Sequence, residues 1–250
     1  MGSAAPDRSE EQPFTVLITG FGPFKRDYPI NPSWEIAHSL PTHLPPLRAK
    51  AFPHTPSAPP PPHEKPILPP VRLLVHPAPI RVNYKTVRAL VPELWSLGEG
   101  GEGGGGDGVE GGGQRIDAAI HVGMAGPRLF YSIERRGHRD GYAMPDVDVE
   151  DVLARWRGYS PKHMDLRISE DAGHYLCDFI YFSSLAHLER AGERRRVLFL
   201  HVPSDASEHS IATGRELLLQ LVRSVVESEM AKREKEKAGA AADTAADAAN

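Results

Sequence analysis

Several short segments of this sequence are mainly apolar or β-branched, without the regular alternation expected of a strand that has one face in water. The first is residues 14–19, and similar segments follow at 71–76, 116–124, 129–134 and 196–203. Continuous apolar strands fit a sheet that is covered on both faces, which requires helices between the strands. Helical spacing of apolar residues does recur between them, so the sequence predicts an α/β fold.

The predicted helices have recognisable ends. Asn31 and Pro32 suit the N-cap and the first position of a helix that ends near residue 41. Further helices are expected at 83–95, at 149–157 within an otherwise irregular segment 137–161, from the Ser-Glu-Asp-Ala-Gly cluster at 169–173 to about 189, and from 207 to 225, with a short strand at 165–168.

Composition separates one core from four segments of low complexity or high polarity. Residues 13–231 form the expected single domain, with a proline-rich insert at about 53–70 and a glycine-rich insert at about 98–114. The leader at 1–12 and the charged, then alanine-rich tail at 232–250 are expected to be disordered, although a frayed helix is the alternative for the tail. The inserts cannot bury apolar area and are expected to be extended or flexible connections.

Composition also excludes several classes of function. The net charge of −4, with both signs interspersed, provides no basic footprint for nucleic acid. No apolar run reaches the roughly 20 residues that a membrane span requires. The polar N-terminus is unlike a signal peptide, and the single cysteine excludes an internal disulfide framework and fits a reducing compartment, so we expect a cytoplasmic protein.

Two glycine-containing segments do not meet the requirements of a nucleotide site. Gly20 and Gly22 follow the first strand, but the third glycine of a dinucleotide loop is missing and Pro23 comes next. The glycine-rich insert carries no lysine at phosphate-binding spacing. We therefore expect no cofactor.

The only cysteine, Cys177, falls in the first turns of the helix that follows the 169–173 cluster. A thiol there lies near the partial positive charge of unpaired backbone N–H groups, which favours the thiolate and supplies donors for an oxyanion. The alternative is that Cys177 is a small buried hydrophobe, and its position alone favours that alternative.

A histidine and a glutamate stand near the ends of two predicted strands. His201 leaves the carboxyl end of a buried-type strand and should point toward the rim where the cysteine helix begins. Glu134 ends an apolar segment and needs a partner there; the alternative is a surface position beside Arg135 or Arg136. Cysteine, histidine and acid together are the side chains of a cysteine hydrolase.

Four segments stand out by their order along the chain. They are Thr19-Gly20-Phe21-Gly22-Pro23-Phe24 with Asn31-Pro32-Ser33-Trp34, Gly123-Met124-Ala125-Gly126-Pro127-Arg128 followed by Glu134, Ala172-Gly173-His174-Tyr175-Leu176-Cys177-Asp178, and Leu200-His201-Val202-Pro203. Together they resemble the motifs of the pyroglutamyl-peptidase I family of cysteine peptidases, which remove N-terminal pyroglutamate. The resemblance covers about residues 14–230, apart from the two inserts.

The resemblance implies a three-layer α/β/α fold with a central twisted mixed sheet, of the phosphorylase/hydrolase-like kind, and a metal-free exopeptidase acting on N-terminal pyroglutamyl peptides. It implies that Cys177 is the nucleophile, His201 its base and later acid, and Glu134 the carboxylate that orients the histidine. The substrate-binding residues expected around the neutral lactam ring are Phe21, Phe24, Leu176 and Met124; for Phe21 and Phe24 the alternative is that they plug the core beneath their loop.

The chain departs from the family pattern at several positions. Met124 replaces a glutamine common in the family, and Asp178 replaces an asparagine, so an acid adjoins the thiol and opposes thiolate formation unless it points away. The family's arginine near 143–146 is missing, and the segment 145–165 is shorter. Two alternatives to an active peptidase therefore stay open, a catalytically silent homologue that binds pyroglutamyl ligands and a proline-rich interaction protein. Oligomeric state also stays open.

Overall fold

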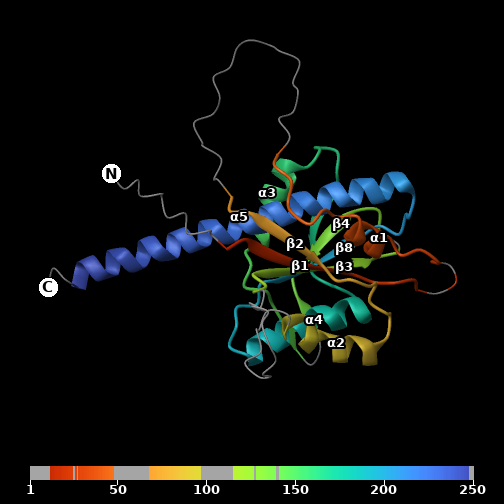
Figure 1. Ribbon diagram of the computed structural model, residues 1–250, viewed down its shortest axis with the longest axis horizontal. Helices are drawn as coiled ribbons and strands as arrows, with labels where there is room; N and C mark the ends of the chain where they lie inside the picture. The colour runs from red at the N-terminus through yellow and green to blue at the C-terminus, as the bar shows by residue number, and fades with distance from the viewer. Residues whose placement is uncertain are drawn as a thin grey trace, which may run out of the picture.

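The computed structural model describes residues 12–24, 26, 28–47, 68–96, 115–126, 128–138 and 141–247. Most of the predicted leader, most of the proline-rich insert and the glycine-rich insert lie outside the described residues. Within them the chain forms a central sheet with helices on both faces (Figure 1).

The central sheet has six strands in the order β2-β1-β3-β8-β4-β7. Every neighbouring pair is parallel except β4 and β8, which run antiparallel, so the sheet is mixed as expected. The strands are β1 (Phe14–Gly20), β2 (Val71–Val75), β3 (Ala118–Met124), β4 (Tyr131–Glu134), β7 (Leu166–Ser169) and β8 (Val197–Val202).

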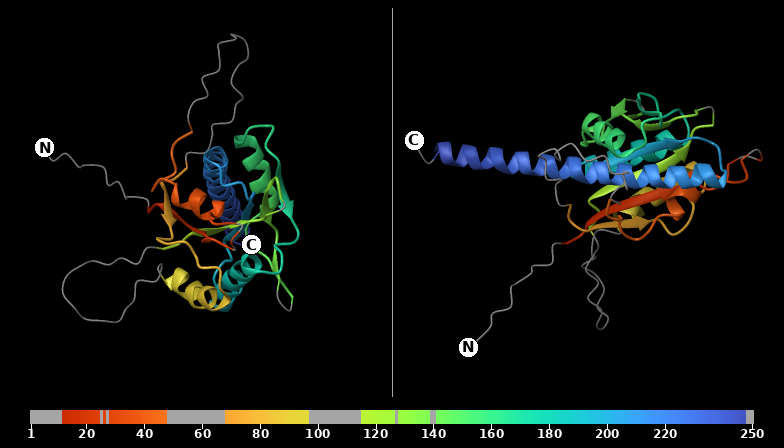
Figure 2. Two further views of the ribbon diagram at one scale, coloured as in Figure 1. Left: turned by 90° about the vertical axis from the view of Figure 1, so that its right-hand side faces the viewer. Right: turned by 90° about the horizontal axis from the view of Figure 1, so that it is seen from above.

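Five helices cover the two faces of the sheet, which confirms the three-layer fold. On one face lie α1 (Pro32–His38), α3 (Val149–Tyr159) and α5 (Glu208–Asp247); on the other lie α2 (Tyr84–Ser96) and α4 (Leu176–Arg190), as Figure 2 shows from two sides. Each face has its own hydrophobic cluster, because the central strands β1, β3 and β8 are buried on both sides.

Helix α1 begins as predicted, and α4 does not. Asn31 accepts a hydrogen bond from the Ser33 backbone N–H at the start of α1, with Pro32 at the first position. The N-cap of α4 is Tyr175, whose side chain makes no capping bond. The predicted capping cluster instead stabilises the preceding loop, where Asp171 accepts from the Gly173 N–H.

Two segments differ from the expected organisation. The segment after Glu134, expected to be irregular, contains a small hairpin of β5 (Gly137–His138) and β6 (Tyr142–Ala143) that contacts α4. Helix α5 continues to Asp247, past residue 232 where we expected a frayed helix or disorder, because alanine, glutamate and lysine there all favour helix. Its last part projects away from the domain (Figure 1). None of the described helices has the length and apolarity needed to cross a membrane.

Candidate active site

The site is built on one face of the sheet, at the carboxyl ends of β3 and β8. His201 on β8 lies opposite Gly123 on β3 and opposite Ser132 on the antiparallel strand β4. Directly paired residues point to the same face, and so do residues two apart on one strand. The side chains of His201 and Glu134, and the position where Gly123 lacks a side chain, therefore all face the layer formed by α2 and α4.

Glu134 and His201 form a buried pair. The Nδ1 atom of His201 lies 2.6 Å from Oε1 of Glu134, and the Glu134 side chain has no exposed surface. Burial would raise the pKa of this carboxyl, but the hydrogen bond and charge of His201, with a further hydrogen bond from Arg128, hold the pKa of Glu134 below its ordinary value. The alternative of a surface glutamate is therefore wrong; Arg135 pairs instead with Glu150 and Glu170.

Arg128 is a site residue whose contacts were not predicted. Its Nη1 donates to Oε1 of Glu134 at 2.6 Å and to Oγ of Ser132 at 2.9 Å. Its Nη2 donates to the backbone carbonyl of Asp171 at 2.9 Å, in the loop that leads to α4. Arg128 thus links the buried carboxylate to the start of the cysteine helix. The sequence signal was the need of a buried acid for a cation nearby.

Cys177 is the second residue of α4 and keeps part of its surface exposed. Its Sγ lies beside the position where Gly123 lacks a side chain, so that a Cβ there would lie 2.8 Å from Sγ and 2.5 Å from Cζ of Phe199. The Phe199 ring also approaches the His201 ring, with centroids 4.8 Å apart. The structure therefore brings Cys177 to the strand pair that carries His201, although no hydrogen bond joins Sγ to the imidazole in the described part of the chain.

The thiol of Cys177 is not in the electrostatic state that its helix position predicted. Burial raises its pKa to about 12, the negative charge of Glu134 acts in the same direction, and Arg128 opposes both. The expected preference for thiolate is therefore wrong for this state of the protein, because desolvation outweighs the helix N-terminus. Asp178 turns away from the thiol and accepts from the backbone N–H and Nδ1 of His138, although its charge adds to the shift.

The four expected substrate-binding residues are not equally placed. Phe21 is 3% exposed and belongs to the same apolar cluster as Leu176, Cys177 and Phe199, so it lies in the core beneath its loop. Leu176 is also buried, at the first position of α4. Phe24 and Met124 are half-buried. Because Met124 follows Gly123 in β3, its side chain leaves the strand toward the opposite face of the sheet.

A second buried histidine fixes the position of α4. Nδ1 of His121 lies 2.8 Å from Oγ1 of Thr19, and Nε2 lies 2.8 Å from Oγ of Ser184 on α4. Complete burial lowers the pKa of His121 to about 3, so this imidazole is neutral. Sequence reasoning missed its role, since nothing local distinguishes it from the other histidines. In the described residues, no group of three or more His, Cys, Asp or Glu side chains has the geometry to hold a metal ion.

Comparisons with known proteins agree on one kind of relative. No protein-family model matches the chain. It is similar to pyroglutamyl-peptidase 1 of Rattus norvegicus, with 27% identity over 216 residues that cover 77% of this chain and 81% of the relative. Similarity to the pyrrolidone-carboxylate peptidase of Thermococcus kodakarensis is 24% over 208 residues, covering 75% and 80%.

The fold is also found in solved structures. Pyrrolidone carboxyl peptidase from Thermococcus litoralis matches with a TM-score of 0.60 at 15% identity, covering 88% of this chain and 96% of that one. Pyroglutamyl peptidase I from Bacillus amyloliquefaciens matches with a TM-score of 0.57 at 16% identity, covering 86% and 94%. At such identities the likeness establishes the three-layer fold, and it agrees with the resemblance of the sequence motifs.

Proposed function

We propose that this protein, a relative of the pyroglutamyl-peptidases, is a cysteine exopeptidase that hydrolyses the bond after an N-terminal pyroglutamyl residue. The observation that carries the proposal is the fully buried Glu134–His201 pair beside the start of the helix that bears Cys177. A buried carboxylate that holds one imidazole nitrogen is the third member of a nucleophile–base–orienter arrangement.

In the proposed reaction, Cys177 and His201 share one proton. The carboxylate of Glu134 accepts from Nδ1–H of His201, which leaves Nε2 as the nitrogen that takes the thiol proton. Because the pKa of the resting thiol is raised, the proton moves to His201 as sulfur attacks the pyroglutamyl carbonyl carbon. The imidazolium that forms is stabilised by the buried charge of Glu134.

The remaining steps return the enzyme to its starting state. Backbone N–H groups at residues 174–177 hold the oxyanion, and His201 protonates the departing amine as the C–N bond breaks. Water, deprotonated by His201, then hydrolyses the thioester and releases pyroglutamate. The neutral lactam has no ammonium group, so an apolar pocket that includes Phe24 accepts it and rejects a charged N-terminus that would lose its hydration there. Phe21 and Leu176 support that pocket from below.

The test is release of a chromogenic amine from a pyroglutamyl amide by the pure, reduced protein. We expect turnover by the wild type and none by Cys177→Ser with an unchanged melting temperature. The same amide of proline, which carries a charged secondary amine, should not be cleaved. Absence of turnover by the wild type, while a peptidase from Thermococcus works in parallel, would contradict the proposal.

One observation favours a second function, that of a catalytically silent homologue that binds pyroglutamyl ligands. The raised pKa of Cys177 and the lack of a hydrogen bond to His201 are both features of an unactivated thiol. Under this alternative, a pyroglutamyl peptide binds the wild type and Cys177→Ser with equal affinity, and neither protein releases amine. Isothermal calorimetry beside the amide assay separates the two functions.

A further inference from the structure

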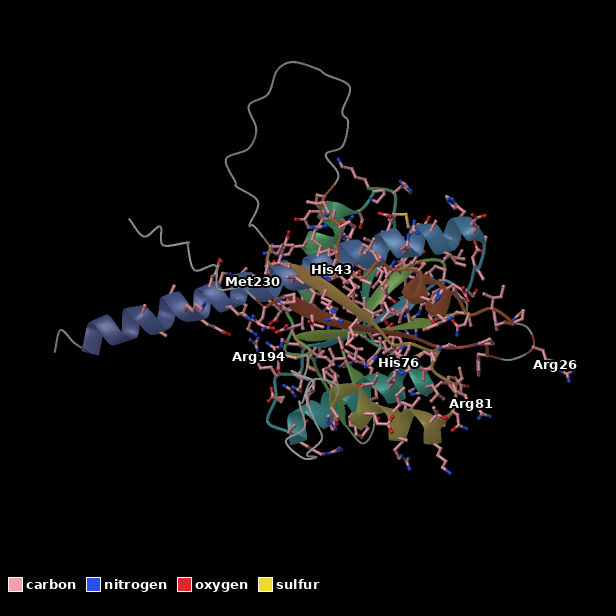
Figure 3. The ribbon with its side chains drawn as sticks, viewed as in Figure 1. Arg26, His43, His76, Arg81, Arg194 and Met230 are labelled. Atoms are coloured by element: carbon pink, nitrogen blue, oxygen red, sulfur yellow. The ribbon has the colours of Figure 1, made fainter. Side chains whose placement is uncertain are left out.

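A cavity of about 400 Å³ lies at the end of the sheet opposite the candidate active site. Its wall includes Arg196, which immediately precedes β8, whereas His201 lies near the other end of that strand. Five residues of strand separate the two positions by about 16 Å. Figure 3 places Arg194 at this end of the molecule and Arg26 and Arg81, which follow β1 and β2, at the other.

Arg196 is the unusual residue of this cavity. It is 9% exposed, and its Nε atom is buried without a hydrogen-bond partner among the described residues. Arginine stays protonated in proteins, so a buried guanidinium nitrogen with no acceptor carries a desolvation penalty. The nearest acids, Glu229 and Asp117, act on Arg196 only from a distance.

Two other residues contribute buried donors that lack hydrogen-bond acceptors, one on α2 and one in the segment that also carries Arg196. Nε1 of Trp95, near the end of α2, is buried without a hydrogen-bond partner, and so is Nη2 of Arg194. Arg194 has only a long ion pair, 3.6 Å from Glu229. Arg115 lines the cavity as well and keeps 74% of its side chain exposed. Three arginines and one indole N–H therefore surround a single space.

The acids around the cavity neutralise these arginines only in part, through long ion pairs. Asp117 accepts from the Thr15 backbone N–H and lies 3.6 Å from both Arg115 and Arg233. The only other acid in the described wall is Glu193, which is exposed. Apolar side chains of Ile116 and Leu188 complete the wall and reduce the competition from water.

We propose that this cavity binds a phosphate-type oxyanion, either inorganic phosphate or the phosphate group of a small molecule. The fork of a guanidinium matches phosphate oxygens, and donors that come from three separate elements suit a tetrahedral dianion better than the two oxygens of a carboxylate. Bound phosphate would give the buried Nε atom of Arg196 the acceptor that the described residues do not supply. The proposal does not depend on the peptidase function.

The test measures phosphate binding by calorimetry and by thermal melting, in sodium phosphate against sodium chloride at equal ionic strength. We expect saturable binding and a rise in melting temperature of several degrees in the wild type. Arg196→Met should weaken binding by at least about tenfold. In chloride it should melt at the wild-type temperature or above, because it removes a buried guanidinium nitrogen that has no acceptor.

The matched control is Arg195→Met, since Arg195 is the next residue but pairs with Asp146 and Glu189 outside the cavity. It should melt lower in both salts and keep the full response to phosphate. Glucose 6-phosphate distinguishes a phosphorylated small molecule from the free ion, and succinate tests the carboxylate alternative. No saturable binding in the wild type, equal binding by Arg196→Met, or tighter binding of succinate than of phosphate would overturn the proposal.

Discussion

Gly123 decides how closely the cysteine helix approaches the sheet. With no side chain at this position of β3, Sγ of Cys177 and the ring of Phe199 both occupy the space that a Cβ would fill. Arg128 holds the same helix through the loop before it, because its guanidinium bonds both the buried carboxylate of Glu134 and the Asp171 carbonyl. At the scale of single residues, the geometry of the site therefore depends on the lack of a side chain at Gly123 and on the guanidinium of Arg128.

Gly123→Ala should reduce both stability and turnover. The added methyl group meets Sγ at 2.8 Å and Phe199 at 2.5 Å, so the helix or the ring must move. Overpacking of this kind costs about 1–3 kcal/mol. Urea unfolding and the amide-release assay measure the two effects. Gly141→Ala is the control, because nothing lies within 4 Å of a Cβ there. Equal behaviour of the two variants would refute the role of Gly123.

Glu134→Gln should separate thiol reactivity from turnover. The charge of Glu134 is the second cause, after burial, of the raised pKa of Cys177, so removing it lowers that pKa and increases the thiolate fraction at about pH 8. Alkylation by iodoacetamide, which labels the only cysteine, should become faster. Amide release should fall by about 100-fold or more, because His201 loses its orienting carboxylate.

The control for this variant is Glu150→Gln, which removes an exposed partner of Arg135 and should change neither rate. Slower alkylation of Glu134→Gln than of the wild type would show that Glu134 activates the resting thiol and would contradict the electrostatic account.

At the scale of elements, His121 joins two strands and a helix. Its ring contacts Thr19 on β1 and Ser184 on α4 from its own position on β3. In the neutral imidazole one nitrogen donates and the other accepts, and the two hydroxyls take the complementary roles. Protonation would place a positive charge in a fully buried site, so the attachment of the cysteine helix to the sheet depends on pH.

The free energy of unfolding should fall as the pH drops below the pKa of an ordinary histidine. In the folded protein the pKa of His121 is about 3, below the ordinary histidine value of 6.5. Between these two pH values the unfolded chain therefore binds a proton that the folded chain does not. Stability therefore rises with pH in this window and is lost toward acid, by up to about 1.4 kcal/mol per pH unit. Urea unfolding at several pH values from about 5 to 6.5 measures the slope.

His121→Gln should be less stable overall but show a smaller slope in this range. Glu134 contributes little to the slope in this pH range, because its stabilising contribution is lost only below the ordinary glutamate pKa of 4.5. His163→Gln, which changes an exposed histidine, should keep the wild-type slope. An unchanged slope in His121→Gln would mean that other groups cause the acid sensitivity.

At the scale of the whole molecule, α5 belongs to the core along only part of its length. Val222, Val225 and Val226 are buried against the sheet, and Glu227 accepts from Tyr159 on α3. From residue 234 to 241 the side chains are exposed. Residues 234–241 of the helix are thus held by helix propensity more than by packing.

Truncation should reveal this boundary. A chain that ends at Glu234 should melt within about 1 °C of the full chain, because it keeps every buried contact of α5. A chain that ends at Val225 loses Val226 and the bond of Glu227 to Tyr159, and it should melt at least about 5 °C lower. Thermal melting by circular dichroism is sufficient. A large loss in the longer variant would place a stabilising contact beyond residue 234.

The sequence by itself determined the order of the main elements and the family resemblance. Continuous apolar runs and helical spacing are local patterns, and they located six strands and five helices to within a few residues, except for the C-terminal end of α5. The residues of the candidate triad could be named because their motifs are short and contiguous. The hairpin of β5 and β6 was missed, since strands of two residues leave no periodicity to detect.

Only the tertiary structure decided what each site residue experiences. The sequence left open whether Cys177 is an activated thiol or a small buried hydrophobe, and burial, followed by the charge of Glu134, raises the pKa of this thiol. The loop of Phe21 predicted a ligand wall, but the ring lies in the core. The side chains that bury each site residue, and the hydrogen-bond partners of Glu134 and His121, come from chain segments that are distant in sequence. Desolvation and charge act through space, so no local pattern can report them.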